Sequence, residues 1–226
     1  MRKKIVILGA GSTAREALDL VEYCSQNKGL YEPLGFVIDP PYGGPGQLIN
    51  GKPVLGDFEW LAKHHKEVYV VCGIGHPHHR FHVVRRAEQI PCRFVSLVHP
   101  WTEQYFCSRW SSIGEGSMLY GCGVSDQTRI GRHVLIHGYS VVAHNVMVGD
   151  FVTISSGVHI NGYASIGTGC YIGSGAIIRD TVKIGDWAFV GAGSVVTKDI
   201  PENARAVGNP ARVIEQKKAG WHLAAE

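Results

Sequence analysis

The sequence lacks the features that mark membrane proteins and secreted, disulfide-bonded proteins. Its 226 residues contain no run of 18 apolar residues, so no helix is expected to span a bilayer. The short apolar run near the start leads into charged Arg15 and Glu16 without a small-residue cleavage site, which favours a buried strand of a cytoplasmic protein over a signal peptide. The six cysteines form no CxxC pair, and their surroundings favour buried free thiols over disulfides or a metal site.

An excess of charge of one sign is also missing. The chain has 22 basic and 19 acidic residues, a net charge of +3, which argues against nucleic acid or an anionic membrane as the main partner. Charged residues make up only 18% and hydrophobic residues 45%, so the chain can bury a core and wholesale disorder is excluded. The length suits one large domain or two modest ones.

Glycine is abundant, at 29 residues, and most of it falls after residue 110 within a six-residue repeat. An α-helix, with 3.6 residues per turn, cannot keep a strict period of six, whereas a chain of short strands can. Three hexads would form a triangular coil of 18 residues whose aliphatic side chains point inward. The repeat therefore predicts a parallel β-helix rather than a β-sandwich. The positions expected to point inward are Met118, Val124, Ile130, Ile136, Val142, Val148, Ile154, Ile160, Ile166, Ile172, Ile178, Ile184, Val190 and Val196.

The spacing of four glycines supports a coil of 18 residues. Gly131, Gly149, Gly167 and Gly185 recur at that interval, so we expect them to stack at one corner and to adopt positive φ there. No loop insertion is expected between residues 118 and 199.

Residues 1–98 follow a different pattern, in which strands alternate with helices. Strands are expected at 4–8, 34–38, 67–73 and 92–98, and helices at 14–26, 57–66 and 78–89, with Asp57 as an N-cap and a glycine- and proline-rich loop at 42–50. This alternation predicts a small Rossmann-like parallel α/β sheet. The predicted organisation is thus an α/β domain at 1–98, a β-helix at 99–214 and a tail at 215–226 that could be helical.

The first strand is followed by Gly9-x-Gly11 and then by a helix, as in loops that bind phosphate. The third position of the fingerprint is Ala14 instead of glycine, so a nucleotide phosphate and a merely structural turn both remain open. Asp39, at the end of the second strand, could accept hydrogen bonds from a ribose or a base.

Several segments together resemble the NeuD/PglD-like family of sugar O- and N-acetyltransferases. They are KIVILGAGSTAREALDL, GFVIDP, GKPVLG, VVCGIG, SLVHP, the hexads, VVAHNVMVGDFV and AVGNPARVI. The resemblance implies a left-handed β-helix and a homotrimer with active sites between neighbouring subunits. It also implies acetyl-CoA as co-substrate, no metal, and a sugar or nucleotide-sugar acceptor held by the α/β domain.

The resemblance also implies which residues act. His144 would be the general base, a role that suits an imidazole near neutral pH. Asn145 stands where relatives often carry an acidic residue. Stacking by 18 places Asp126 one coil before His144, as a possible substitute for that acid, and Gly162 one coil after it, where we expect open space for a ligand and a backbone N–H for the oxyanion. The implied coenzyme contacts are Thr153, Gly162, Ser174 and Ala192, and the implied acceptor contacts are Gly11, Ser12, Thr13, Ile38, Asp39 and Gly73.

Other functions remain to be weighed. A carbonic anhydrase on this fold needs three histidines converging on zinc, but His133, His137, His144 and His159 are not spaced by the coil length. An NAD-dependent oxidoreductase would need more than about 98 residues before the repeat. A non-catalytic nucleotide-binding scaffold is supported by Asn145. Among acetyl transfers, N-acetylation of a 4-amino-sugar nucleotide is favoured, and O-acetylation of a sialic acid or another sugar hydroxyl stays open.

Overall fold

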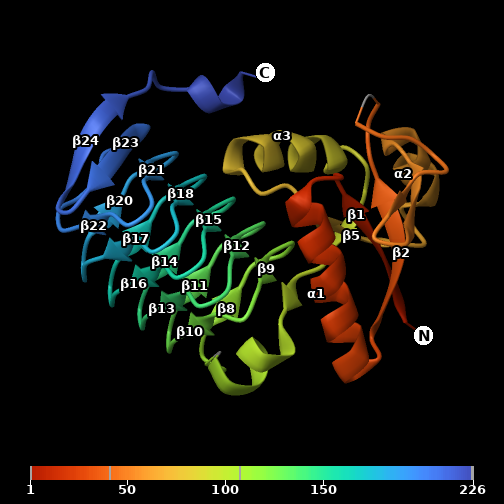
Figure 1. The fold of residues 1–226 in the computed structure, drawn as a ribbon, viewed down its shortest axis with the longest axis horizontal. Coiled ribbons are helices and arrows are strands. Elements are labelled where there is room, and N and C mark those ends of the chain that lie inside the picture. The colour runs from red at the N-terminus through yellow and green to blue at the C-terminus, as the bar shows by residue number, and fades with distance from the viewer. Residues whose placement is uncertain (1, 41, 107, 225–226) are drawn as a thin grey trace.

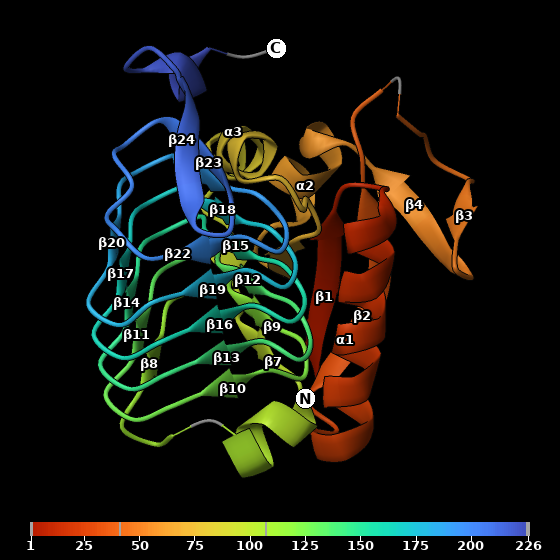
Figure 2. The same ribbon diagram turned by 60° about the vertical axis from the view of Figure 1, so that its left-hand side comes forward.

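The computed structural model describes residues 2–40, 42–106 and 108–224, which form an α/β unit packed beside a β-helix (Figure 1). Within these residues no helix is long and apolar enough to cross a membrane. Figure 2 shows the β-helix from a second side, with α1 lying against one flank of the prism.

The α/β unit has a six-stranded sheet in the order β3-β4-β2-β1-β5-β6, in which β3 pairs antiparallel with β4 and the other described pairs are parallel. The central strand β1 is fully buried from Ile5 to Leu8. This arrangement confirms the predicted parallel sheet. The elements are β1 (Lys3–Leu8), α1 (Ser12–Lys28), β2 (Tyr31–Val37), β3 (Leu48–Ile49), β4 (Lys52–Gly56), α2 (Phe58–His64), β5 (Tyr69–Cys72), α3 (Pro77–Ala87) and β6 (Arg93–Phe94).

Three local features of this unit can be compared with the expectations. Asp57 caps α2 as predicted, because its carboxylate accepts hydrogen bonds from the backbone of Glu59 and Trp60. The loop predicted at 42–50 was wrong in part, since β3 forms a hairpin with β4. The strand predicted at 92–98 was also wrong: β6 joins the α/β sheet, and β7 (Leu97–Val98) pairs with β9 of the β-helix.

The β-helix consists of short parallel rungs arranged in three sheets. Sheet 1 contains β10, β13, β16, β19 and β22, sheet 2 contains β8, β11, β14, β17 and β20, and sheet 3 runs from β7 through β9, β12, β15, β18 and β21 to β23 and β24. The rungs are β8 (Ser112–Ile113), β9 (Met118–Leu119), β10 (Gly123–Val124), β11 (Arg129–Ile130), β12 (Leu135–Ile136), β13 (Val141–Val142), β14 (Met147–Val148), β15 (Thr153–Ile154), β16 (His159–Ile160), β17 (Ser165–Ile166), β18 (Tyr171–Ile172), β19 (Ile177–Ile178), β20 (Lys183–Ile184), β21 (Phe189–Val190) and β22 (Val195–Val196).

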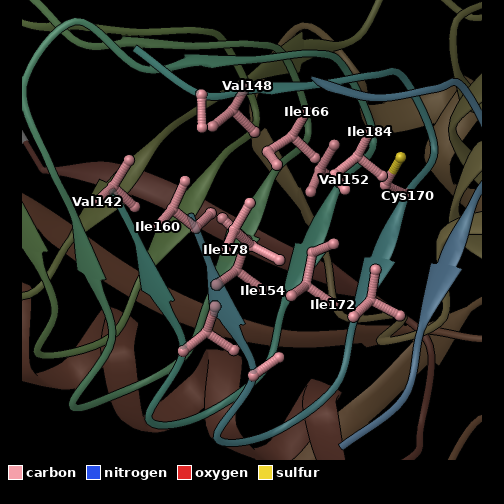
Figure 3. Close-up of a cluster of buried hydrophobic side chains, with 14 of the residues drawn as sticks. Val142, Val148, Val152, Ile154, Ile160, Ile166, Cys170, Ile172, Ile178 and Ile184 are labelled. Atoms are coloured by element: carbon pink, nitrogen blue, oxygen red, sulfur yellow. The ribbon is translucent and has the colours of Figure 1, made fainter. Parts of the chain in front are cut away.

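The interior of the prism is a dry stack of aliphatic side chains (Figure 3). The register between neighbouring coils is 18 residues, as between Val142 and Ile160, which places like residues directly above one another. All positions predicted to point inward from Val124 to Val196 are at most 4% exposed. Burial of this continuous apolar column supplies the main stabilisation of the β-helix.

The prediction for Met118 was wrong, because the first coil is one residue shorter than the others. Ile136 pairs with Leu119, so Leu119 takes the inward position. Met118 instead packs with Leu135 in the cluster of apolar residues that joins sheet 3 to the α/β unit.

The reason given for the stacked glycines was also wrong. Gly131, Gly149, Gly167 and Gly185 do not have positive φ. Glycine is needed there because the coils approach too closely for a side chain: a Cβ on Gly131 would lie 2.6 Å from the carbonyl carbon of Gly149. Positive φ occurs two residues later in each coil, at His133, Phe151, Gly169 and Trp187.

Arg80 of α3 joins the α/β unit to the β-helix. It is 1% exposed and donates hydrogen bonds to the carbonyl oxygens of Ile74, Gly75, His133, Phe151 and Val152 and to the hydroxyl of Thr153. Burial lowers the pKa of Arg80 to about 10, so the guanidinium remains cationic at neutral pH. Five carbonyl dipoles thus take the place of a carboxylate partner.

The chain ends with elements that close the prism and return to α3. An antiparallel hairpin of β23 (Ala204–Gly208) and β24 (Ala211–Gln216) follows the last rung, and the 3-10 helix η2 (Trp221–Leu223) lies over α3. His78 and His82 donate from Nε2 to the carbonyl oxygens of Ala224 (3.1 Å) and His222 (3.0 Å). A single turn of π-helix, η1 (Thr102–Phe106), lies at the opposite end of the prism.

The cysteines that the structure describes contribute packing. Cys72 and Cys170 are free, and burial raises the pKa of each thiol to about 12, which keeps both in the unreactive protonated form. Cys107 lies outside the described residues.

Candidate active site

The edge between sheet 1 and sheet 2 stacks one position of each coil and will be called the histidine corner. It is formed by Asp126, His144, Gly162 and Asp180. Hydrogen bonds between coils hold the stack, such as Asn145 N–H to the Asp126 carbonyl (3.0 Å) and Tyr163 N–H to the His144 carbonyl (3.2 Å). This is the edge of the triangle that sheet 3 does not reach, so it lies away from the α/β unit.

His144 is exposed, and its ring lies flat over Gly162. A Cβ at Gly162 would come within 2.7 Å of the His144 Cε1 atom, so glycine leaves room for the imidazole in this position. The expectation of open space above Gly162 was therefore wrong, since the ring fills it. Tyr163 flanks the imidazole with its ring edge, at 5.3 Å between centroids.

Asn145 holds one side of this imidazole. The Asn145 backbone is left-handed, with φ of 59°, a conformation that asparagine tolerates well. Its Oδ1 lies 3.0 Å from His144 Nδ1. If Nδ1 carries the proton, Nε2 presents its lone pair away from the amide and can accept a proton from a substrate.

An open groove of about 600 Å³ continues the histidine corner toward the carboxyl end of the prism. It is lined by Arg179, Thr181, Val182, Thr197, Lys198 and Asp199. Arg179 directly precedes Asp180, which stacks in the same column as His144. Lys198 lies one coil after Asp180 in that column. Two exposed cations and the hydroxyls of two threonines are groups suited to a phosphorylated ligand.

The four residues implied as coenzyme contacts do not meet within one chain. Gly162 lies against His144. Ser174 and Ala192 are exposed and stack on another edge, between sheets 1 and 3. Thr153 is 2% exposed in sheet 3, where its hydroxyl donates to the Gly75 carbonyl (2.7 Å) and accepts from Arg80.

A cavity of about 470 Å³ lies at the carboxyl ends of β1 and β2, between the loop after β1 and helix α3. Three of the implied acceptor contacts, Gly11, Ile38 and Asp39, line it. The other three stand beside it: Ser12 begins α1, Thr13 packs against Gly75, and Gly73 packs against α1. The lining residues are Leu8, Gly9, Ala10, Gly11, Val37, Ile38, Asp39, Tyr42, Phe58, Ile74, His78, His79, His82 and Val83.

The chemistry of this cavity suits an anionic ligand with a flat apolar part. Among the described residues no side chain caps the start of α1, so its first N–H groups can bind phosphate oxygens. Phe58 offers an aromatic face that the Arg86 guanidinium covers from outside at 4.1 Å, and Arg86 also forms an ion pair with Asp39. These groups fit a nucleoside diphosphate.

The sequence interpretation missed the histidines of this cavity. His78 and His82 are four residues apart, a spacing that places both on one face of α3, and this was the signal available. His133, by contrast, belongs to no ligand site: it is fully buried between Phe94 and Phe151, and neither ring nitrogen has a hydrogen-bond partner in the described part of the chain. Within the described residues no group of three or more potential ligands could hold a metal ion.

Comparisons with known proteins show what the two parts of the chain are similar to. Residues 4–87 match the family described as PglD N-terminal domain, and residues 127–162 and 163–198 match the bacterial transferase hexapeptide (six repeats). The chain is 33% identical over 159 residues to GDP-perosamine N-acetyltransferase from Escherichia coli O157:H7, which covers 70% of this chain and 69% of that protein.

Solved structures extend the likeness over almost the whole chain. The acetyltransferase domain of PglB from Neisseria gonorrhoeae FA1090 is 27% identical with a TM-score of 0.82, covering 94% of this chain and 100% of that one. PerB from Caulobacter crescentus, solved with CoA and GDP-perosamine, is 26% identical with a TM-score of 0.84, covering 94% and 97%. The predicted fold, a Rossmann-like domain followed by a left-handed parallel β-helix, is confirmed.

Proposed function

Because the chain belongs to the NeuD/PglD-like family of hexapeptide-repeat sugar acetyltransferases and is an acetyl-CoA-dependent acyltransferase, we propose that it N-acetylates a nucleotide-linked 4-amino sugar. The Escherichia coli relative and a Caulobacter crescentus neighbour are named as GDP-perosamine N-acetyltransferases, which favours an amino group over the hydroxyl of a sialic acid as acceptor. The single observation that carries the assignment is the imidazole of His144, exposed at the prism corner with Nδ1 held by Asn145.

In the proposed mechanism His144 acts as general base. Its Nε2 removes a proton from the acceptor amine as the nitrogen attacks the thioester carbonyl of acetyl-CoA. The tetrahedral intermediate then collapses, the C–S bond breaks, and the proton is available for the departing thiolate. Gly162 keeps the ring in place by leaving room for it. A backbone N–H at Gly162 as oxyanion donor stays a prediction.

The positions of the two sites support a homotrimer, which is part of the proposal. Within one chain, the acceptor cavity lies on the side of sheet 3, and His144 lies at the opposite edge of the prism. The sugar amine can therefore reach His144 only if a second copy brings its cavity to this corner. The exposed apolar residues on sheets 1 and 2 and at the corner between them would be covered in such an assembly; they are Val141, Met147, Tyr163 and Ile177.

The same assembly gives the coenzyme a path. We place the acetyl group at His144 and the phosphates of acetyl-CoA in the groove with Arg179 and Lys198. Ser174 and Ala192 would then line the path from the neighbouring copy. A cytoplasmic location, where such co-substrates are found, is the final part of the proposal.

The test is acetyl transfer measured by thiol release from acetyl-CoA. We expect turnover with a GDP- or UDP-linked 4-amino sugar and none with sialic acid. His144→Ala should lower kcat by about 10²–10⁴-fold with the fold retained, because general base catalysis contributes that much. His65→Ala, at the C-terminal end of α2 and outside the histidine corner and the acceptor cavity, is the matched control and should behave as the natural protein. Near-normal turnover of His144→Ala would overturn the mechanism, and no thiol release with any amino-sugar nucleotide would support a non-catalytic scaffold.

A further inference from the structure

A chain of hydrogen bonds continues from His144 beyond Asn145 to the coil below. Asn145 Nδ2 donates to the side-chain oxygen of Gln127, at 3.2 Å, while Asn145 Oδ1 faces His144 Nδ1, at 3.0 Å. Gln127 and Asn145 occupy equivalent left-handed positions in successive coils, with φ of 55° and 59°. The stacking of the coils therefore places these two amides in line with the imidazole.

The direction of this chain decides which nitrogen of His144 is basic. A side-chain amide has an oxygen that accepts and a nitrogen that donates, so turning Asn145 over would exchange the two ends. With the oxygen toward His144, Nδ1 carries the proton and Nε2 has a free lone pair. With the nitrogen toward His144, Nδ1 must accept, Nε2 carries the proton, and the ring cannot act as a base from Nε2.

An acidic residue after the histidine would need no such help, because a carboxylate has two acceptor oxygens and no donor. Asparagine lacks this built-in direction, so the orientation of its amide depends on the partner at its other end. The structure offers Gln127, whose oxygen receives the Asn145 NH₂ group.

We propose that Gln127 is a positioning residue for acetyl transfer. By accepting from Asn145 Nδ2, it turns the Asn145 oxygen toward His144 Nδ1 and thereby keeps Nε2 free to take the proton of the acceptor amine. This inference rests on the proposed function, in which His144 is the base. It gives a role to a residue one full coil away from the histidine in sequence.

Three substitutions at Gln127 separate the direction of its hydrogen bond with Asn145 from the size of its side chain. Glutamate can only accept from Asn145, lysine can only donate, and methionine can do neither. We expect Gln127→Lys to lower kcat at least about tenfold, since a wrongly placed proton removes the general base. Gln127→Met should fall between the other two, and Gln127→Glu should keep the highest kcat and move the acidic limb of the pH–rate profile to higher pH. KM for acetyl-CoA and for the amino-sugar nucleotide should stay within about twofold, as should the melting temperature within a few degrees.

Measurements at high salt distinguish an effect of the charge at residue 127 from an effect of the direction of its hydrogen bond. At about 1 M salt the Debye length falls to about 3 Å, so a purely electrostatic effect of an exposed side chain would vanish. We expect the order Glu, Met, Lys to persist. A ranking that disappears at high salt, or equal kcat for the three variants, would overturn the inference.

A second variant tests the link through residue 145. Asn145→Asp restores a carboxylate that holds Nδ1–H without help, so adding Gln127→Lys to it should cost less than adding Gln127→Lys to the natural protein. Equal costs in both backgrounds would contradict the proposed relay. His144→Ala separates this from the proposed function: if that variant is active, the base assignment fails, whereas an inactive His144→Ala with unchanged Gln127 variants defeats only the relay.

Discussion

Two histidines of the same prism, His133 and His144, show how the surroundings of a corner decide what a side chain does. His133 lies on the edge between sheets 2 and 3, which α3 and β6 cover, and it packs between aromatic rings with neither nitrogen hydrogen-bonded to a described residue. His144 lies on the edge that no described part of its own chain covers, exposed and hydrogen-bonded by an amide. The coil geometry is the same, so burial alone makes one histidine a packing residue and leaves the other available for proton transfer.

At the covered edge, polar side chains lose their hydration, which does not happen at the exposed edge. Desolvation lowers the pKa of His133 to about 3, so its neutral form is the one that folds. Arg80, beside it, is buried with its charge and depends on the carbonyl oxygens of Ile74 in the α/β unit and of His133 in the β-helix. Substitutions at the covered edge should therefore change the free energy of unfolding, and substitutions at the exposed edge should change the rate of acetyl transfer.

The largest effect is expected from Arg80→Met. This change leaves the buried carbonyls of His133 and Phe151 without their donor, and each such group costs about 1–3 kcal/mol, whereas the Val152 carbonyl still accepts from the Leu135 N–H. The free energy of unfolding should therefore fall by at least about 2 kcal/mol in urea titrations. A loss below about 1 kcal/mol would mean that Arg80 does not hold the two parts together.

Gly162→Ala tests the exposed side. The added methyl group would meet the His144 ring at 2.7 Å and push it from its place, while the Gly162 backbone is not left-handed and should not be strained. We expect kcat to fall about hundredfold, because small misplacements of a catalytic group are costly. Thermal unfolding should show an unchanged melting temperature.

The matched control for this substitution is Gly44→Ala, in the loop before β3, where no atom lies within 4 Å of a new Cβ. Its kcat should match the natural protein. A Gly162→Ala enzyme with normal kcat would show that His144 has room elsewhere in the active assembly.

The last effect concerns pH and is the smallest per step, because it accumulates gradually over the acid range. Because the pKa of His133 is lowered in the folded state, the unfolded chain takes up the proton first, and stability is lost as pH falls from about 6.5 toward 3. His133→Leu should remove this contribution, so that the difference in unfolding free energy from the natural protein changes by roughly 1 kcal/mol per pH unit in that window. Burial also lowers the pKa of His76, to about 4, but that group is present in both proteins and cancels.

The same difference in unfolding free energy should stay constant above pH 7. A constant difference across the whole range would show that His133 has no unfavourable protonation in the fold. Circular dichroism melts at closely spaced pH values would be sufficient for this measurement.

The sequence predicted the β-helix better than its connections to the α/β unit. The inward positions from Val124 onward follow from a local period, so each hexad carries its own evidence. Two features depend on pairing between distant segments, which no local pattern records. One is the first coil, which is one residue shorter and so points Met118 away from the interior of the prism; the other is the pairing of β7 with sheet 3. The close approach of coils at Gly131 is likewise invisible until the coils are stacked.

The candidate site divides in the same way. His144 and Asn145 stand together in one motif, so a resemblance was enough to propose them. Gln127 and the α3 histidines reach their positions only through the stacking of coils and the placement of a helix. Thr153 shows the converse: its position matches the family, yet in this chain its hydroxyl is occupied by Arg80 and Gly75. Its role toward the coenzyme stays a prediction.

The terminal hairpin has a consequence for how copies of this protein can associate. A stack of parallel rungs would otherwise end in a free edge to which the first rung of another molecule could add, producing fibres. Because β24 runs antiparallel to β23, the outer edge does not present the strand direction that continuation of the parallel stack needs, and it carries exposed Arg212 and Glu215. The repeat is thereby closed against end-to-end polymerisation, and its lateral faces remain the ones through which assembly can proceed.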